Sequence, residues 1–283
     1  MRRPLSILVA GLIALAAAGC GAQKSAQNAV QNAVDPVAQA ATRTASAGSV
    51  EVTMTGKVSA SGQEIPLSGT GAFDLKAKRG HFDLTTTVPG QGDLKIQELV
   101  DGLTIYLRSD VFARFLPAGK HWLKLDLQAL GKKAGIDLGQ LQQLGAGTDP
   151  TQFLSYLAKT ADVQKVGDED IDGTPTTHYR ATIDLDKLAA ASGDPKLAES
   201  VRQLQKTTGI KQIPTDVWIG KDGRVRRQSL DYTSTGATPT RVSFVIDYRN
   251  YGVPVDVQTP DAGDTLDAAT LLGALGGTGG TGG

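Results

Sequence analysis

The chain has 283 residues, of which 40% are hydrophobic and 20% are charged. This hydrophobic fraction is typical of a soluble globular protein. Basic and acidic side chains number 29 each, so the formal net charge is zero. The sequence therefore lacks the excess of lysine and arginine, and the basic stripe, that mark nucleic-acid-binding proteins.

The first twenty residues have the pattern of an export signal. Two arginines precede an uncharged apolar run over residues 5–18, which is shorter than the roughly 20 apolar residues of a membrane span. Cys20, the only cysteine, ends the sequence AAGC, which resembles the bacterial lipobox, although Ala17 stands where leucine is usual. We therefore expect residues 1–19 to be a lipoprotein signal peptide and Cys20 to be the lipid-attachment site.

A diacylated Cys20 would hold the chain at the extracytoplasmic face of the cell membrane, because two acyl chains anchor a protein where one binds only marginally. The alternative is an ordinary signal peptide with an incidental cysteine. An unpaired thiol in an exported protein favours the lipoprotein. Without residues 1–19, about 264 residues remain, enough for one large domain or two small ones.

The segment after Cys20 is rich in alanine, glutamine and asparagine, and residues 20–35 are predicted to be a flexible tether. Val37 and Ala41 then have helical spacing. They predict a helix over about residues 36–46 that ends before Gly48, since glycine is common just after a helix.

Strand patterning begins at residue 50 and continues to about residue 125. Val50, Val52 and Met54 alternate with polar residues, and the same period recurs in the following short runs. Tight-turn signals such as Asp101-Gly102 separate the runs. Short strands joined by tight turns indicate an antiparallel meander rather than a parallel sheet with crossover helices.

Two helical insertions interrupt the strands. The first covers about residues 138–157, and the second begins at Asp194-Pro195 and ends at Gly209. Further strands are predicted near residues 163–166, 177–185, 216–220, 224–232 and 241–248.

About ten strands in one sheet are enough for a twisted sheet to curl. We predict an α+β fold: a strongly curved antiparallel sheet, or half-barrel, with helices covering its concave face. Residues 261–283 end in a Gly/Thr-rich stretch and are predicted to be a flexible tail, with a weak helix over about residues 264–275.

Three stretches are similar to a known family. They are IDGTPTTHYRATIDL (171–185), PTDVWIGKDGRVRRQSLDY (214–232) and FVIDYRNYGVPVDVQTP (244–260). They resemble the LppX/LprG-type lipoproteins of actinobacteria, in the wider LolA/LolB-like group of lipid carriers. The resemblance covers about residues 36–260, and its motifs are mostly turns and strand edges, which identify a fold better than a function.

The resemblance implies that residues 36–260 form a LolA-like lipid-binding domain with an apolar cavity between sheet and helices. It also implies a cargo of acyl chains, such as palmitate, or lipoglycans, carried across the cell envelope, with a membrane transporter as a further partner. The alternative is a regulatory or scaffolding lipoprotein of the envelope that acts through its surface and has a filled core.

Strand and helix periods select the residues expected to contact an acyl chain. The strand positions are Phe82, Leu84, Ile96, Leu103, Ile105, Leu123 and Leu125, and the helix positions are Leu138, Leu141, Leu197, Val201 and Leu204. A register error of one residue would turn a strand's whole set outward.

No metal, cofactor or catalytic site is predicted. The three histidines have no metal-ligand spacing, and His178 is expected to hydrogen-bond within the sheet. Residues 168–170 lack the alternating oxygen ligands of a calcium loop and are read as a solvated turn. No nucleophile, phosphate-loop or dinucleotide motif marks an enzyme. The basic cluster over residues 224–227 could meet lipid phosphates, but it favours the exposed face of an edge strand.

Overall fold

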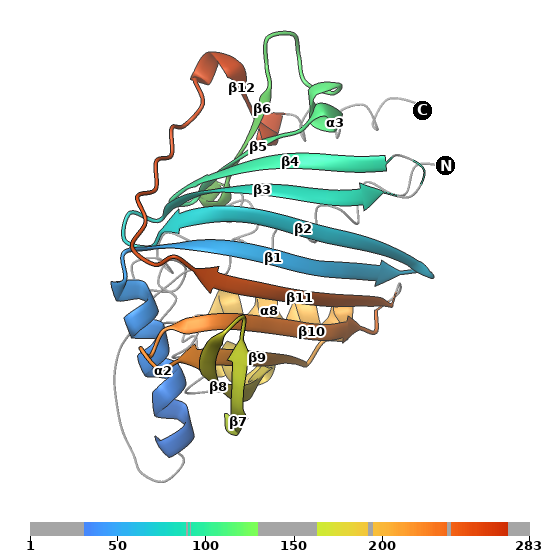
Figure 1. Cartoon of the computed structure of the whole chain (residues 1–283). Coiled ribbons are helices and arrows are strands. Elements are labelled where there is room, and N and C mark those ends of the chain that lie inside the picture. The colour runs from blue at the N-terminus through green and yellow to red at the C-terminus, as the bar shows by residue number, and fades with distance from the viewer. Residues whose placement is uncertain are drawn as a thin grey trace.

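The computed structural model describes residues 31–88, 90, 92–129, 163–191, 195–236 and 239–270. Its strands form one sheet in the order β12-β6-β5-β4-β3-β2-β1-β11-β10-β9-β8-β7 (Figure 1). Their bounds are β1 (Ser49–Ala60), β2 (Gln63–Asp74), β3 (Arg79–Val88), β4 (Gly92–Asp101), β5 (Thr104–Arg108), β6 (Trp122–Asp126), β7 (Gln164–Ile171), β8 (Thr174–Asp184), β9 (Gln212–Gly220), β10 (Val225–Ser234), β11 (Thr240–Arg249) and β12 (Thr265–Asp267).

The predicted fold class, a curved and mainly antiparallel sheet accompanied by helices, is confirmed. The described residues contain twelve strands rather than about ten. All neighbours pair antiparallel except β12, which runs parallel to β6. One pairing at the centre of the sheet joins distant segments and is not part of the predicted meander. The strand β1 lies between its sequence neighbour β2 and the distant strand β11.

The N-terminal helix, α2 (Gln31–Ser46), begins five residues earlier than predicted. Pro36 therefore lies inside the helix rather than in its first turn. The predicted end is confirmed: Gly48 follows with a φ of +86°, a conformation that glycine adopts without a Cβ penalty. Val37 and Ala41 are fully buried, as their helical spacing indicates.

The second helical insertion consists of α7 (Leu185–Ala191) and α8 (Pro195–Thr208). The predicted limits of α8 are confirmed, with Gly209 at a φ of +70° after its last turn. The helix α7 was not predicted. It begins where the Asp184 carboxylate accepts hydrogen bonds from the backbone N–H groups of Asp186 and Lys187, at 3.0 and 3.1 Å. The predicted first insertion, residues 138–157, lies outside the described residues.

The acidic residues 168–170 belong to a strand, so their assignment to a turn is wrong. The β7–β8 hairpin turns at Asp172 and Gly173 alone, whose φ angles are 51° and 80°. Two consecutive residues with positive φ make the tight type I′ turn that suits a two-residue hairpin. With this turn, Ile171 pairs with Thr174, and the acidic residues 168–170 pair with residues of β8.

At the other edge of the sheet, β12 follows a short 3₁₀ helix, η1 (Ala262–Asp264). Thr265 of β12 pairs with Trp122 of β6, so the sheet extends beyond residue 260. A strand therefore occupies the start of the segment where a weak helix was predicted. The contacts of η1 include a hydrogen bond from the backbone N–H of His121 to the Asp264 carbonyl, at 2.9 Å.

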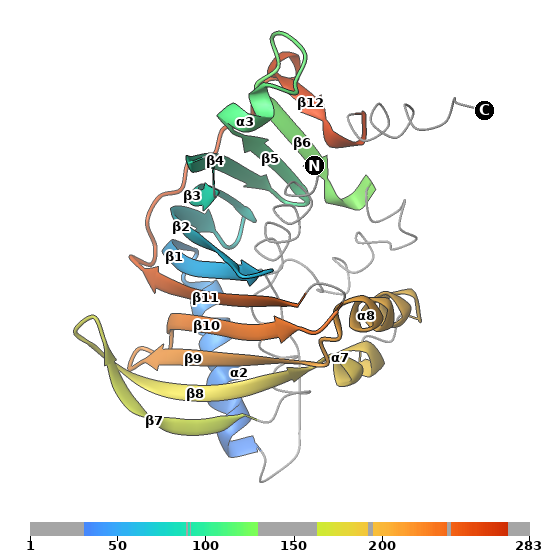
Figure 2. The same ribbon diagram turned by 90° about the vertical axis from the view of Figure 1, so that its right-hand side faces the viewer.

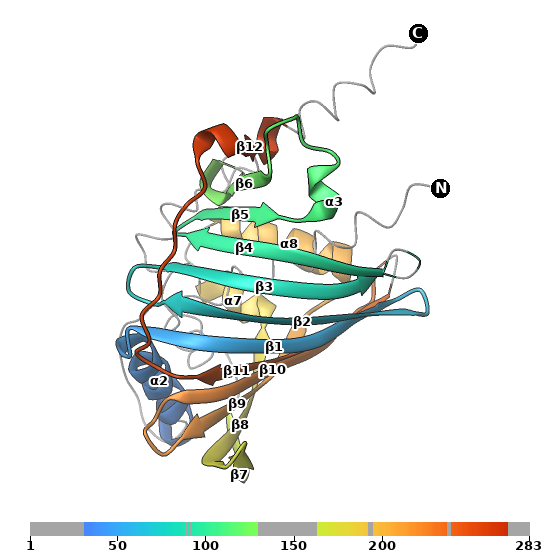
Figure 3. The same ribbon diagram turned by 45° about the horizontal axis from the view of Figure 1, so that its top comes forward.

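The helices α2, α7 and α8 pack on the same side of the sheet, which we call the inner face (Figure 2). Val37 of α2, Ala198 of α8 and Val217 of β9 belong to one buried cluster there, the helix-covered cluster. A second cluster, the β1–β6 cluster, lies beside it on the same face and is built from β1, β3, β4, β5 and β11. Figure 3 shows the long strands β1–β4 side by side across this half of the sheet.

Glycines in β2 explain how one aromatic ring packs on the inner face. A Cβ atom at Gly71 would stand 2.5 Å from Cδ2 of Phe82, and one at Gly69 would stand 2.6 Å from its Cε1. The ring of Phe82 therefore lies flat against the β2 backbone and is 1% exposed. Only glycine permits this close approach.

Candidate functional site

The inner face of the β1–β6 cluster is a continuous apolar surface. Strand register aligns its residues across the sheet: Met54 of β1 pairs with Ile246 of β11, and Leu84 of β3 pairs with Ile96 of β4. Paired residues point to the same face, so these side chains lie in neighbouring rows. Among the described residues, the helical side chains that pack on this cluster come from α3 (Asp110–Ala113) and from Leu127, just after β6.

The structure brings most of the predicted wall residues together. Six of the seven belong to the β1–β6 cluster: Phe82, Leu84, Ile96, Ile105, Leu123 and Leu125. The first four are buried and the two leucines of β6 are half-buried. Leu103, in the turn before β5, is also half-buried.

The predicted lid residues are placed differently. Val201 of α8 is buried in the helix-covered cluster, away from the wall residues. Leu138 and Leu141 lie outside the described residues. Leu197 and Leu204 lie within α8, but their side chains are outside the described set. A role for any of these residues in ligand contact stays a prediction.

The sequence-based selection missed the centre of the apolar face. Val50, Val52 and Met54 of β1 and Phe244 of β11 are all buried in the β1–β6 cluster. Their alternation with polar residues was visible in the sequence. Their central position was not, because it depends on the pairing of β1 with β11, whose residues are nearly two hundred positions apart.

A carboxylate lies within this apolar face. Glu98 of β4 is 3% exposed, and it pairs with Phe82 on one side and Leu107 on the other. Its Oε2 atom is buried and has no hydrogen-bond partner in the described part of the chain. Burial away from water disfavours the charged form and raises the pKa of Glu98 to about 7. Sequence reasoning missed this residue, although it occupies the position after Leu94 and Ile96 in the buried series of β4.

The outer face carries a polar cluster around His178. The ring nitrogens of His178 lie 2.8 Å from Glu169 and 2.7 Å from Asp216. The Trp218 ring stacks on the imidazole at 4.3 Å between centroids, and its Nε1–H donates to Glu169 at 2.7 Å. Hydrogen bonds from Trp218 and then His178 lower the pKa of Glu169. The prediction that His178 hydrogen-bonds within the sheet is confirmed.

This cluster joins strands rather than preparing a reaction. Both nitrogens of His178 already contact carboxylates, so neither is free to act as a general base or to bind a metal. The contacts link β7, β8 and β9, and Arg180 adds a 2.9 Å bond to Asp216. In the described part of the chain, no group of three or more histidine, cysteine, aspartate or glutamate residues could hold a metal ion.

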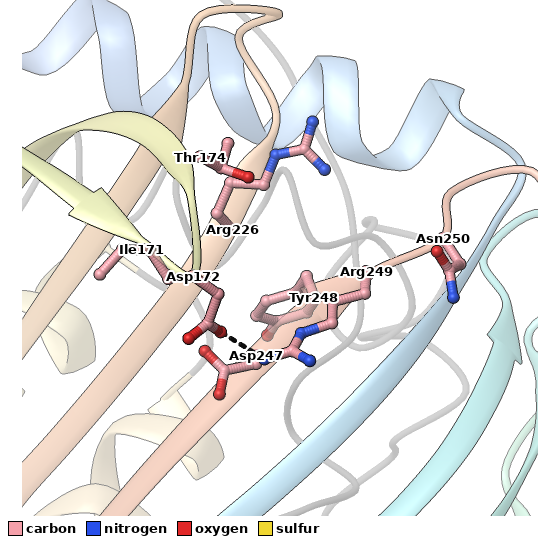
Figure 4. Close-up of a pocket in the computed structure, with 8 residues that line it drawn as sticks. All are labelled: Ile171, Asp172, Thr174, Arg226, Asp247, Tyr248, Arg249 and Asn250. Carbon is pink, nitrogen blue, oxygen red and sulfur yellow. Dashed lines mark hydrogen bonds and ion pairs between the residues drawn. The ribbon is translucent and has the colours of Figure 1, made fainter.

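A polar pocket of about 250 Å³ lies beside this cluster, where the β7–β8 turn approaches the end of β11 (Figure 4). Ile171, Asp172 and Thr174 line it together with Arg226 and residues 247–250. Asp172 accepts a hydrogen bond from Arg249 across the opening.

The arginines at the start of β10 are paired with carboxylates. Arg226 bonds Asp222 at 2.6 Å, and Arg227 bonds Asp247 at 2.5 Å. The sequence favoured an edge strand for this basic cluster, and that interpretation is wrong, because β10 is hydrogen-bonded between β9 and β11. These pairings offset the cluster's positive charge and leave little attraction for a lipid phosphate.

The chain is similar in sequence to two Streptomyces proteins. No family model matches the chain. It is 28% identical over 204 residues to an uncharacterized 31.2 kDa protein of Streptomyces griseus, a match that covers 68% of this chain and 66% of that protein. It is 28% identical over 160 residues to a candidate lipoprotein of Streptomyces coelicolor, covering 55% of this chain and 45% of that one. The chain thus spans less than two thirds of the length of each relative.

Solved structures similar to the chain include two further actinobacterial proteins. The lipoprotein LppX of Mycobacterium tuberculosis is 18% identical with a TM-score of 0.46, over 80% of this chain and 97% of that one. LprF from Mycobacterium bovis is 16% identical with a TM-score of 0.40, over 81% and 97%. Likeness at this level carries no argument about function. These matches confirm that the chain resembles the LppX/LprG-type lipoproteins of actinobacteria.

Proposed function

We propose that this protein is a membrane-anchored lipoprotein that binds acyl chains or lipoglycans against the apolar inner face of its sheet and carries them across the cell envelope. The observation that supports it best is the continuous apolar surface formed by β1, β3, β4, β5 and β11. A surface of this kind suits a long hydrocarbon chain, because burying each methylene contributes about 0.8 kcal/mol without any polar contact.

The anchor in this proposal is Cys20. The chain would lose residues 1–19, carry acyl chains on Cys20 and extend from the membrane through the residues before α2. The lipid-binding domain would run from α2 to β12, because β12 belongs to the same sheet, and the tail would follow β12. Among the described residues, no helix is long and apolar enough to cross a membrane.

The proposed activity needs no catalysis. In the polar cluster around His178, both imidazole nitrogens are engaged, by Glu169 and Asp216. The protein would act by binding and releasing cargo, with a membrane transporter as its partner.

Paired substitutions on β6 test the proposal. Leu123 and Leu125 are half-buried on the inner face, whereas Lys124 lies between them on the opposite face. Replacing both leucines with tryptophan fills the proposed site without disturbing its most buried residues. Lys124→Trp is the matched control, because it adds the same side chain to the same strand on the outer face.

Binding is measured with a fluorescent fatty acid, cis-parinaric acid, and lipids extracted from the purified protein are identified by mass spectrometry. We expect the double variant to bind at least tenfold more weakly than wild type, and Lys124→Trp to bind as wild type does. If wild type binds no probe and yields no lipid, the carrier proposal is wrong. A regulatory or scaffolding role through the protein surface then replaces it.

A further inference from the structure

Glu98 occupies an apolar position on the inner face. In β4 the buried residues Leu94, Ile96 and Glu98 alternate with the exposed residues Lys95 and Gln97. The period of two places the Glu98 carboxyl on the same face as the two aliphatic side chains before it. A leucine or valine would continue the pattern of this strand.

The described surroundings of Glu98 leave its Oε2 atom without a hydrogen-bond partner. Phe82 and Leu107, the residues that pair with it on β3 and β5, are both buried and apolar. Glu98 is itself only 3% exposed, and Oε2 has no hydrogen-bond partner among the described residues. An unpartnered buried polar atom destabilises a protein by about 1–3 kcal/mol, so it calls for an explanation.

We propose that Glu98 is the polar subsite of the lipid-binding face and accepts a hydrogen bond from a hydroxyl group of the bound lipid. This inference rests on the proposed function and adds to it a chemical class of cargo: an acyl or alkyl lipid that carries a hydroxyl at the depth of Glu98. The hydroxyl would supply the partner that Oε2 lacks, while Phe82 and Leu107 contact the hydrocarbon on either side.

The chemistry of the site favours a hydroxyl over other headgroup atoms. An ionised carboxylate only accepts hydrogen bonds, so it selects a donor. A phosphate or carboxylate of the ligand would meet a like charge in surroundings of low polarity, which is unfavourable. A hydroxyl is also less costly to bring into the apolar face than an ammonium group, whose charge would need the carboxylate ionised and well aligned.

Two probes that differ by one donor test the subsite. 1-Hexadecanol and 1-methoxyhexadecane share a chain and an oxygen, but only the alcohol donates a hydrogen bond. Each is used to displace cis-parinaric acid from the full mature chain at pH 8, above the pKa of Glu98, where the carboxylate can only accept. We expect wild type to prefer the alcohol by about tenfold, as for one hydrogen bond to a charged group.

Three variants complete the experiment. Glu98→Leu should bind both probes within twofold of each other, because the acceptor is gone. Glu98→Gln keeps the size of the side chain and should lose most of the preference, which preserves the test if the leucine variant does not fold. Gln97→Leu, on the outer face of the same strand, should retain the tenfold preference.

The outcomes separate the subsite from the proposed function. If wild type binds both probes equally, or if Glu98→Leu keeps the preference, the subsite is wrong and the lipid-binding function stands. If wild type binds neither the two probes nor cis-parinaric acid, the lipid-binding function is wrong and the subsite is wrong with it.

Discussion

Replacing Glu98 with glutamine should remove a pH-dependent loss of stability that the wild-type protein carries. The folded protein holds this carboxyl at a pKa of about 7, against 4.5 for an ordinary glutamate. Between these two values the folded state keeps a proton that the unfolded state has lost. The free energy of unfolding therefore falls as the pH rises from about 4.5 through 7, and the loss is complete above 7.

The size of the effect follows from the same two values. Their difference of about 2.5 corresponds to about 3 kcal/mol, because each pKa unit is worth about 1.4 kcal/mol. The cause is desolvation, so the magnitude depends on the burial of Glu98, which is 3% exposed between two apolar neighbours. Glutamine is neutral at every pH and pays no such cost of ionisation.

The assay is urea unfolding of wild type and Glu98→Gln at pH 5, 6, 7 and 8, followed by tryptophan fluorescence. We expect Glu98→Gln to gain up to about 3 kcal/mol relative to wild type between pH 5 and pH 8. The contributions of all other titrating groups to the free energy of unfolding are the same in both proteins and cancel in this difference. Glu64→Gln, at an exposed glutamate paired with Lys57 at 2.9 Å, should change by less than about 1 kcal/mol. Parallel wild-type and Glu98→Gln profiles from pH 5 to pH 8 would refute the reasoning.

Three further predictions concern packing, the outer face and the anchor. Gly71→Val should lower the free energy of unfolding by about 1–3 kcal/mol in urea denaturation, because its Cβ would clash with the His81 carbonyl oxygen and stand 2.5 Å from Cδ2 of Phe82; an unchanged midpoint would contradict this close packing. Trp218→Phe should speed amide hydrogen exchange in β7 but not in β1, because it removes the bond to Glu169 and keeps the stacked ring. Cys20→Ala should release the protein from membranes or leave an uncleaved precursor, and an unmodified wild-type chain that starts elsewhere, seen by intact-mass analysis, would contradict the anchor.

Local signals predicted the elements where a few neighbouring residues decide the conformation. The predicted Asp101-Gly102 turn joins β4 to β5, and Gly102 has a φ of +61°, a conformation that glycine adopts without a Cβ penalty. Alternation with period two in β3 and β4 predicted that Phe82, Leu84 and Ile96 share a face, and these residues lie in one cluster. The start of α8 at Pro195 and its end before Gly209 follow from the same kind of short-range preference.

Pairing between distant segments was beyond such signals. The basic residues of β10 looked like the surface of an edge strand, but β10 is hydrogen-bonded between β9 and β11, and β11 in turn pairs with the distant strand β1. The acidic residues of β7 looked like a solvated turn. Glu169 is instead bonded to Trp218 of β9, a residue 49 positions away. Short-range sequence patterns around a residue do not identify partners that lie so far away in the chain.

The sequence by itself determined the class of fold, the face of most strands and the shared face of six predicted wall residues, because periodicity and turn chemistry act over only a few residues. The tertiary structure decided the strand order, placed Val201 in a different cluster from the wall residues, and buried Glu98 without a partner for Oε2. A glutamate at that position is harmless in an isolated strand, where water solvates it. It loses that water in the folded protein, where β3 and β5 bring Phe82 and Leu107 to either side and Glu98 is 3% exposed.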